Sequence, residues 1–148
     1  MPDAKPNRLR RIDAVIKQAE VKFALGHQTE HIAALDAIRA TVEESGEPRY
    51  RATWHYWRGF LHSLTDGAPA VAIEHCRQAA QIAAAAGFEE LDGFVASALA
   101  QAYVVAGEPR AAIDVGEKAV RVFEARGNIW WSGRTLGHLA NAAVILGH

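Results

Sequence analysis

Glycine recurs about every 20 residues along this chain, and that spacing limits what the chain can fold into. The members of the series are Gly26, Gly46, Gly67, Gly87, Gly107, Gly127 and Gly147. Glycine is favoured just beyond the last turn of a helix, because it enters the left-handed backbone region without a clash at Cβ. Proline follows two residues after three of these glycines, which suits the first turn of a helix. The series therefore predicts helices joined by tight turns.

The intervals between the glycines predict about seven helices in one domain. Their expected ranges are roughly 7–25, 28–45, 48–65, 69–86, 89–106, 109–126 and 129–146. Within the first, Leu9, Ile12, Ile16 and Phe23 form one apolar stripe at helical spacing. No segment alternates with a period of two, so no strand is expected. We expect an all-α chain of antiparallel hairpins at about 8–46, 48–87 and 89–127, followed by a final helix at 129–147.

Small residues also repeat, with a period of about 40 residues. They stand at Ala72, Cys76 and Ala79, and again at Ala112, Gly116 and Ala119. We expect these positions, together with Ala100, at close contacts between paired helices. The interval from Gly46 to Gly67 holds one extra residue, which we assign to the turn at 66–67, so that Gly59 takes the place of Ala100. A period of this length built from helix pairs is typical of an α-solenoid.

This unit resembles a tetratricopeptide repeat, in the longer spacing found in bacterial regulators of the maltose-activator type. Leu99, Ala100 and Tyr103 stand where that family has its Leu-Gly-x2-Tyr, and Ala112 and Ala119 match the alanines of its second helix. The resemblance extends over about 10–147 and departs from the family pattern at three positions of the repeat. It implies a right-handed stack of helix pairs that holds a protein or peptide in the concave groove lined by the first helix of each pair.

The composition excludes several classes of protein. The net charge of −1 is unlike that of a chain that coats nucleic acid. A single cysteine rules out an internal disulfide and fits a reducing compartment. No apolar run approaches the roughly 20 residues needed to cross a bilayer, and the N-terminus lacks the apolar core of a signal peptide. We expect a soluble, cytoplasmic protein with no nucleic-acid or membrane partner.

Seven histidines raise the question of a metal or catalytic site. His27 and His31 are four residues apart, but the turn at Gly26 favours a solvent-exposed pair over metal ligands. His55 and His62 flank Arg58 on the third helix, and this group is either a small-molecule site or the polar edge of a packed helix.

Sequence motifs of enzymes are missing from the chain. Cys76 occupies a small-residue position, so a buried, inert thiol is expected there rather than a nucleophile. No phosphate-binding loop, zinc spacing, nucleophile elbow or dinucleotide fingerprint is found. We expect no catalytic residues, no metal and no cofactor, and the chain is not predicted to be an enzyme.

Aromatic residues crowd the third helix and begin the seventh, and such side chains often anchor a bound partner. The expected binding residues are Trp54, Trp57, Arg58 and Leu61 in the third helix, Ser97, Gln101 and Val104 in the fifth, and Arg134, His138 and Asn141 in the seventh. The expected function is a peptide-binding or protein-binding scaffold, the regulatory part of a larger bacterial signalling or transcription regulator. The alternatives are a small-molecule sensor or enzyme domain that uses the third helix, and an oligomerisation module.

The last helix has an apolar end, and no charged residue follows Arg134. The terminal repeat of a solenoid normally carries a polar outer face. Either a second copy covers this surface or the native chain continues beyond it. We expect a homodimer whose interface includes Val144, Ile145 and Leu146.

Overall fold

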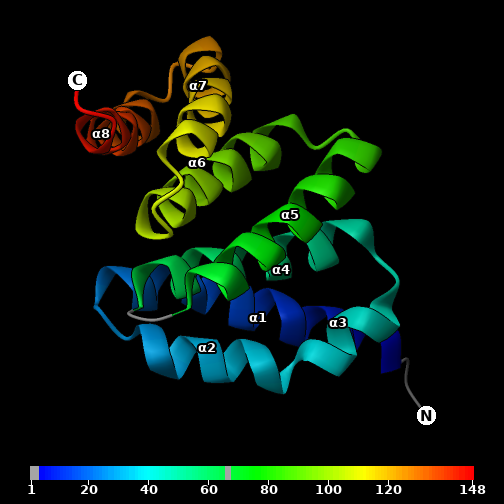
Figure 1. The fold of residues 1–148 in the computed structure, drawn as a ribbon. Coiled ribbons are helices and arrows are strands. Elements are labelled where there is room, and N and C mark those ends of the chain that lie inside the picture. Colours follow the sequence, from blue (N-terminus) through cyan, green and yellow to red (C-terminus); the bar gives the residue numbers. More distant parts are fainter. Residues whose placement is uncertain (1–3, 66–67) are drawn as a thin grey trace.

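A computed structural model describes residues 4–65 and 68–148, which form eight α-helices and contain no strand. The helices are α1 (Ala4–Ala24), α2 (Gln28–Ala37), α3 (Arg39–Ser45), α4 (Pro48–Leu64), α5 (Pro69–Ala86), α6 (Glu89–Val105), α7 (Pro109–Ala125) and α8 (Ile129–Ile145). Figure 1 shows them as successive helix pairs, stacked from the N-terminal end to α8. The expected all-α, solenoid-like arrangement of packed helix pairs is confirmed.

The glycine series ends the helices as the sequence predicts. Six of its seven members adopt a left-handed backbone, with φ between 66° and 85°, and each follows the last residue of a helix by one or two positions. At Gly107, for example, the amide of the next residue returns to the Tyr103 carbonyl at 2.8 Å and closes the end of α6. Gly67 and the extra residue assigned to its turn lie outside the described residues.

The first helix of each pair lies beside the first helix of the next. α4 contacts α6, α6 contacts α8, and α1 contacts α4. Polar side chains link three of them, because Arg134 Nη2 on α8 donates to Gln101 Oε1 on α6 at 3.1 Å, and Gln101 Nε2 donates to the Ser63 carbonyl on α4 at 3.4 Å. The Phe23 ring on α1 meets the Phe60 ring on α4 edge-on, with 5.0 Å between their centroids. This layer of first helices carries the candidate site.

The small-residue positions lie where paired helices approach most closely. Ala100, Ala112 and Ala119 are fully buried, as expected. A Cβ added at Gly59 would overlap the Cys76 sulfur and would lie 3.0 Å from the Ala72 carbonyl oxygen. The α4–α5 contact thus pairs Gly59 with Cys76, just as the α6–α7 contact pairs Ala100 with Gly116.

The prediction of one helix over 28–45 is wrong, because the segment breaks at Ile38 into α2 and α3. At the break the Ile38 backbone has φ −103° and ψ 3°, and its amide bonds to the Leu35 carbonyl three residues back. The indole Nε1–H of Trp54 also donates to that carbonyl, at 2.8 Å. In an uninterrupted helix the Leu35 carbonyl would accept from residue 39. The hydrogen bond from Trp54 therefore takes the place of the intrahelical bond from residue 39. No glycine or proline in the sequence marks the break.

Candidate functional site

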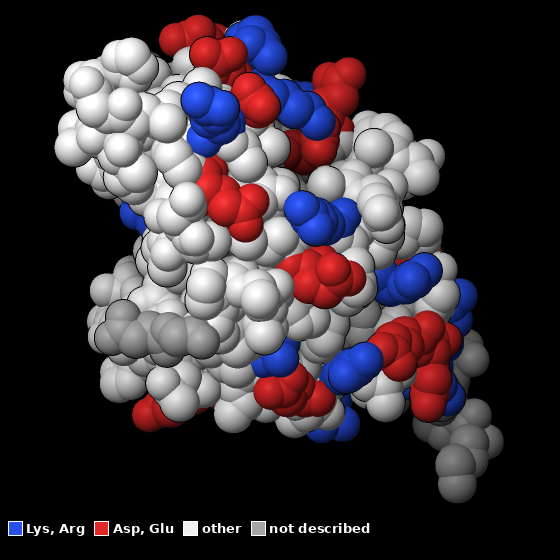
Figure 2. Space-filling model, viewed as in Figure 1, with Lys and Arg blue, Asp and Glu red and all other residues white. Residues whose placement is uncertain are grey.

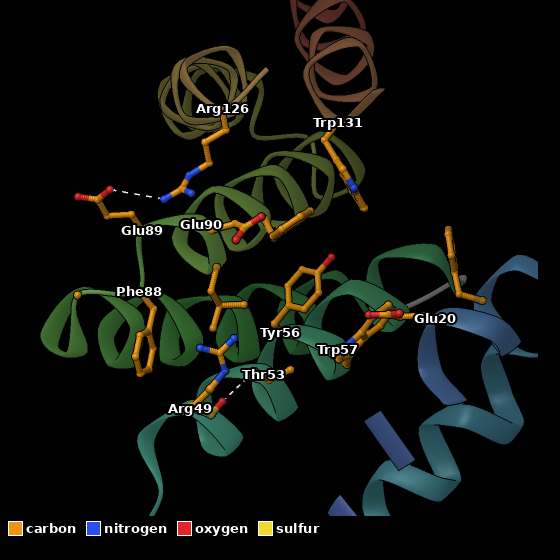
Figure 3. Close-up of a pocket in the computed structure, with 14 residues that line it drawn as sticks. Glu20, Arg49, Thr53, Tyr56, Trp57, Phe88, Glu89, Glu90, Arg126 and Trp131 are labelled. Atoms are coloured by element: carbon orange, nitrogen blue, oxygen red, sulfur yellow. Dashed lines mark hydrogen bonds and ion pairs between the residues drawn. The ribbon is translucent and has the colours of Figure 1, made fainter. Parts of the chain in front are cut away.

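A groove of about 610 Å³ lies on the layer of first helices. α1, α4, α6 and α8 all contribute to its lining, together with the turn between α5 and α6 and the end of α7. Its lining residues are Glu20, Phe23, Arg49, Thr53, Tyr56, Trp57, Gly87, Phe88, Glu89, Glu90, Leu91, Phe94, Arg126 and Trp131. Figure 3 shows these side chains converging from helices that are distant in the sequence.

Aromatic rings from four helices form the floor of the groove. Tyr56 stacks on Phe60 with 5.8 Å between centroids, and Phe94 meets Trp131 edge-on at 5.0 Å. Tyr56 also lies 6.1 Å from Phe94, which connects the lining rings of α4, α6 and α8, and the buried Phe60 packs against them without lining the groove. Burial raises the pKa of the Tyr56 phenol, which stays neutral and can donate a hydrogen bond. Its hydroxyl points into the groove in Figure 3.

Charged side chains surround this floor. At one end the Arg49 guanidinium lies 5.8 Å from the centre of the Phe88 ring, within the range of a cation–π contact. Nearby, Arg126 of the turn after α7 pairs with Glu89 at 3.6 Å. Glu20 projects from α1 toward the Trp57 end in Figure 3.

Three histidines form a second cluster, between α4 and α5 and outside the groove. The Nδ1 atoms of His55 and His75 are 2.9 Å apart, a hydrogen bond in which one ring donates to the other. The His62 ring stacks parallel to the His75 ring, with 6.4 Å between centroids. Burial is the main cause that lowers the pKa of His55 and of His75 to about 4, and it also lowers the pKa of His62. All three rings are therefore neutral at neutral pH.

The binding residues expected on α4 are divided between the core and the groove. Trp54 and Leu61 are buried in the core, where Trp54 bonds to α2 as described above. Trp57 is also largely buried, but one edge of it lines the groove. The guanidinium of Arg58 pairs with Asp36 of α2 at 3.0 Å and lies over the Trp54 ring. Of this set, only Trp57 contributes to the groove.

Four of the residues expected on α6 and α8 lie between helices. Ser97, Gln101 and Arg134 make polar or cation–π contacts to neighbouring helices, and His138 is half-buried on α8. The Ser97 hydroxyl is buried and shares a 2.8 Å hydrogen bond with Thr135. Gln101 and Arg134 belong to the chain of hydrogen bonds that joins α4, α6 and α8. The Arg134 guanidinium also lies 5.8 Å from the centre of the Trp131 ring, beside the groove. For His138, burial followed by the charge of Arg134 lowers the pKa to about 4.

The last two of these residues make no contribution to the groove lining. Val104 is half-buried against the core, and Asn141 is exposed on α8. Neither of them is among the residues that line the groove.

Apolar side chains are exposed on the outer surface of α8. Val144 is 70% exposed and Ile145 is 53% exposed, whereas Leu146 is half-buried and lines a shallow hollow beside Pro109. Trp130, in the first turn of the helix, is 61% exposed. On the face drawn in Figure 2, the lobe over α8 at the upper left is white. The exposure that the interface prediction requires is therefore found at two of its three residues.

Sequence reasoning missed most of the groove, although a signal for part of it was available. On α6, Glu90 and Phe94 lie on the same stripe of the helix as Ser97, which was among the expected binding residues. The groove lies nearer the start of α6 than the residues that were expected to form it. On α4 the stripe of expected binding residues was offset by one position from the residues that line the groove. Gly59 matches Ala100 at an interval of 41 residues, and the same interval relates Tyr56 to Ser97. Applied to the binding residues, this register would have placed Tyr56 in the groove.

Two further predictions concern buried side chains. Cys76 is buried as expected, and burial raises its thiol pKa to about 12, which keeps it protonated and unreactive. The prediction of an exposed His27 and His31 pair is wrong for His31. Its ring is fully buried because α2 begins at Gln28 and turns His31 inward. Burial followed by the charge of Lys22 lowers the pKa of His31.

Comparisons of the chain with models of protein families, with curated proteins and with solved structures found no match. Within residues 4–65 and 68–148, no group of three or more histidine, cysteine, aspartate or glutamate side chains is arranged to hold a metal ion. In the same part of the chain, no helix combines the length and the apolarity needed to cross a membrane.

Proposed function

We propose that this chain is a peptide-binding helical-repeat domain and that its partner lies in the groove formed by α1, α4, α6 and α8. The observation that carries the proposal is the aromatic floor of that groove, to which Tyr56, Phe94 and Trp131 contribute from three different helices. Tyrosine and tryptophan are the residues most often found as anchors in protein interfaces. The resemblance to tetratricopeptide repeats supports the same surface, and it makes the regulatory part of a larger bacterial regulator the proposed context.

The lining of the groove supports a peptide ligand, because its apolar floor is assembled from α1, α4, α6 and α8 and is edged by charged groups. Its volume of about 610 Å³ is also in the range of small-molecule sites, so the volume does not distinguish the two classes of ligand. The residues proposed for the alternative small-molecule site, His55, Arg58 and His62, do not line it. In that cluster Arg58 pairs with Asp36 and lies over the Trp54 ring, and the buried Arg58 Nε and His62 Nε2 have no hydrogen-bond partner within the described residues.

A displayed library of random 12-residue peptides tests the proposal. The library is selected on the wild-type chain and on the variant Thr53→Trp, whose added ring would fill the middle of the groove. The matched control is Gln81→Trp, which adds the same ring at an exposed position of α5. We expect enriched peptides that bind the wild type and the control but not Thr53→Trp. Equal enrichment on all three proteins would refute binding in the groove.

A second candidate role, self-association through α8, is favoured by the exposed Val144 and Ile145. Because the outer surface of α8 carries no charged residue after Arg134, two copies could pair there without bringing like charges together. Burial of apolar surface would supply the free energy, at roughly 25 cal/mol per Å².

Sedimentation of the wild-type chain at micromolar concentration tests this role. A dimer is expected for the wild type and for Val71→Glu, a matched change at an exposed valine of α5, but not for Val144→Glu. A wild-type monomer would refute it.

A further inference from the structure

Three charged side chains of the groove have no opposite charge close to them within the described residues. Arg126 and Glu89 satisfy each other, but Glu20, Glu90 and Arg49 take part in no ion pair within 4.0 Å in residues 4–65 and 68–148. The remaining ion pairs in this part of the chain lie outside the groove lining. The groove therefore offers charge to a ligand as well as apolar surface.

These charges are separated along the groove. Arg49 and Trp57 are both on α4, eight residues apart, which corresponds to about 12 Å along the helix axis. Glu20 precedes Phe23 by three residues, and Trp57 precedes Phe60 by three residues. Since Phe23 and Phe60 are in contact, Glu20 lies near the level of Trp57. Figure 3 shows the same order, with Arg49 and Phe88 at one end, Tyr56 in the middle, and Trp57 and Glu20 at the other end.

We propose that the groove selects an extended peptide segment that carries an acidic residue at one end, a basic residue at the other, and apolar residues between them. The acidic residue would face Arg49 and the basic residue would face Glu20, with Glu90 adding negative charge over the middle of the floor. An extended chain rises about 3.3 Å per residue, so a separation of about 12 Å corresponds to three or four residues. The apolar side chains would pack on Tyr56 and its neighbouring rings.

This inference rests on the proposed function and adds the chemistry of the partner. A nucleic-acid strand fits the groove poorly, because its phosphates would meet Glu20 and Glu90. A purely acidic segment would meet the same carboxylates, and a purely basic one would meet Arg49. Only a segment of mixed charge complements both ends, and the charged ends would also fix the direction in which the chain lies.

The peptide library described above tests the inference through two charge reversals. On the wild type we expect enriched peptides with one acidic and one basic residue three or four positions apart, separated by apolar residues. Arg49→Glu should select a second basic residue in place of the acidic one. Glu20→Lys should select a second acidic residue in place of the basic one. The double variant should again select peptides of mixed charge, with the order of the two charges reversed.

Binding of the most enriched peptide, measured by fluorescence anisotropy, gives the size of the effect. Each single reversal should weaken binding of the wild-type peptide by about twofold to fivefold, the effect expected for the loss of one exposed ion pair. The control reversals are Arg51→Glu, on α4 but outside the groove lining, and Glu74→Lys on α5, and both should leave the affinity unchanged. Far-UV circular dichroism of each variant verifies that the helices remain folded.

The possible results separate this inference from the proposed function. If Thr53→Trp removes binding but the enriched peptides show no charge pattern, the groove binds peptides and the charge inference is refuted. The charge inference also fails if Arg49→Glu and Glu20→Lys select the same peptides as the wild type. If binding survives in Thr53→Trp, peptides do not bind in the groove and both proposals fail.

Discussion

The contact between Gly59 and Cys76 provides a quantitative test of how the helix pairs are packed. In Gly59→Ala, the new Cβ would overlap the Cys76 sulfur and would lie 3.0 Å from the Ala72 carbonyl oxygen and 3.1 Å from the Cys76 nitrogen. The last two atoms belong to the backbone of α5 and cannot move without moving that helix. Overpacking of this kind typically costs about 1–3 kcal/mol.

The helix propensity of alanine opposes this cost and has to be measured separately. Glycine inside a helix is less stable than alanine by about 0.5–1 kcal/mol. Gly133 on α8 provides the reference, because a Cβ added there meets nothing within 4 Å. We expect Gly133→Ala to raise the free energy of unfolding by about 0.5–1 kcal/mol. The free-energy change of unfolding caused by Gly59→Ala should be about 1–3 kcal/mol less favourable than the change caused by Gly133→Ala, because only the substitution at Gly59 creates a steric contact.

Urea unfolding followed by circular dichroism measures both variants, provided that the dependence on urea is the same in each. A third variant, Cys76→Ala, removes the sulfur that the new Cβ would overlap. In that background Gly59→Ala should cost less, which gives a coupling energy in a double-mutant cycle. If Gly59→Ala stabilises the protein as much as Gly133→Ala does, α4 and α5 do not approach each other as described.

Three further predictions concern stability. Ala119→Leu should lower the free energy of unfolding by about 1–3 kcal/mol, since Ala119 is fully buried, and an unchanged melting temperature would contradict that packing. Burial lowers the pKa of His55 and His75 from 6.5 to about 4, so protonation favours the unfolded chain. The contribution of these two residues to stability should thus be complete above about pH 6.5 and should fall as the pH is lowered from there toward 4. Thermal melts at pH 7.5 and pH 5 test this: the melting temperature of a His55→Asn/His75→Asn variant should fall less between the two pH values than that of the wild type. Trp54→Phe should cost about 1 kcal/mol or more in urea unfolding, because it removes the hydrogen bond to the Leu35 carbonyl, and an unchanged midpoint would mean that this bond adds nothing.

Helix ends and the small-residue contacts could be predicted from the sequence because they depend on local chemistry. Gly107 adopts the left-handed backbone that ends α6 without a clash at Cβ, and the regular spacing of the series separates it from glycines inside helices, such as Gly59. The period of 40 residues also located Ala112 and Ala119 at buried contacts, because equivalent residues of a repeat meet equivalent neighbours. For these features the sequence by itself determined the outcome.

Other features depended on contacts between residues far apart in the chain. The break at Ile38 has no local signal, since it accompanies the bond from Trp54 to Leu35 across 19 positions. Trp54 and Tyr56 are both buried, and the rotation of α4 against its neighbours decided which of them reaches the groove: Trp54 faces α2, whereas Tyr56 faces Phe94 and the groove lining. Both residues are large, aromatic and able to donate a hydrogen bond, so their chemistry alone could not separate them. Only the tertiary structure brought Glu20, Tyr56 and Trp131 to one groove, because a surface assembled from four helices depends on how those helices are packed.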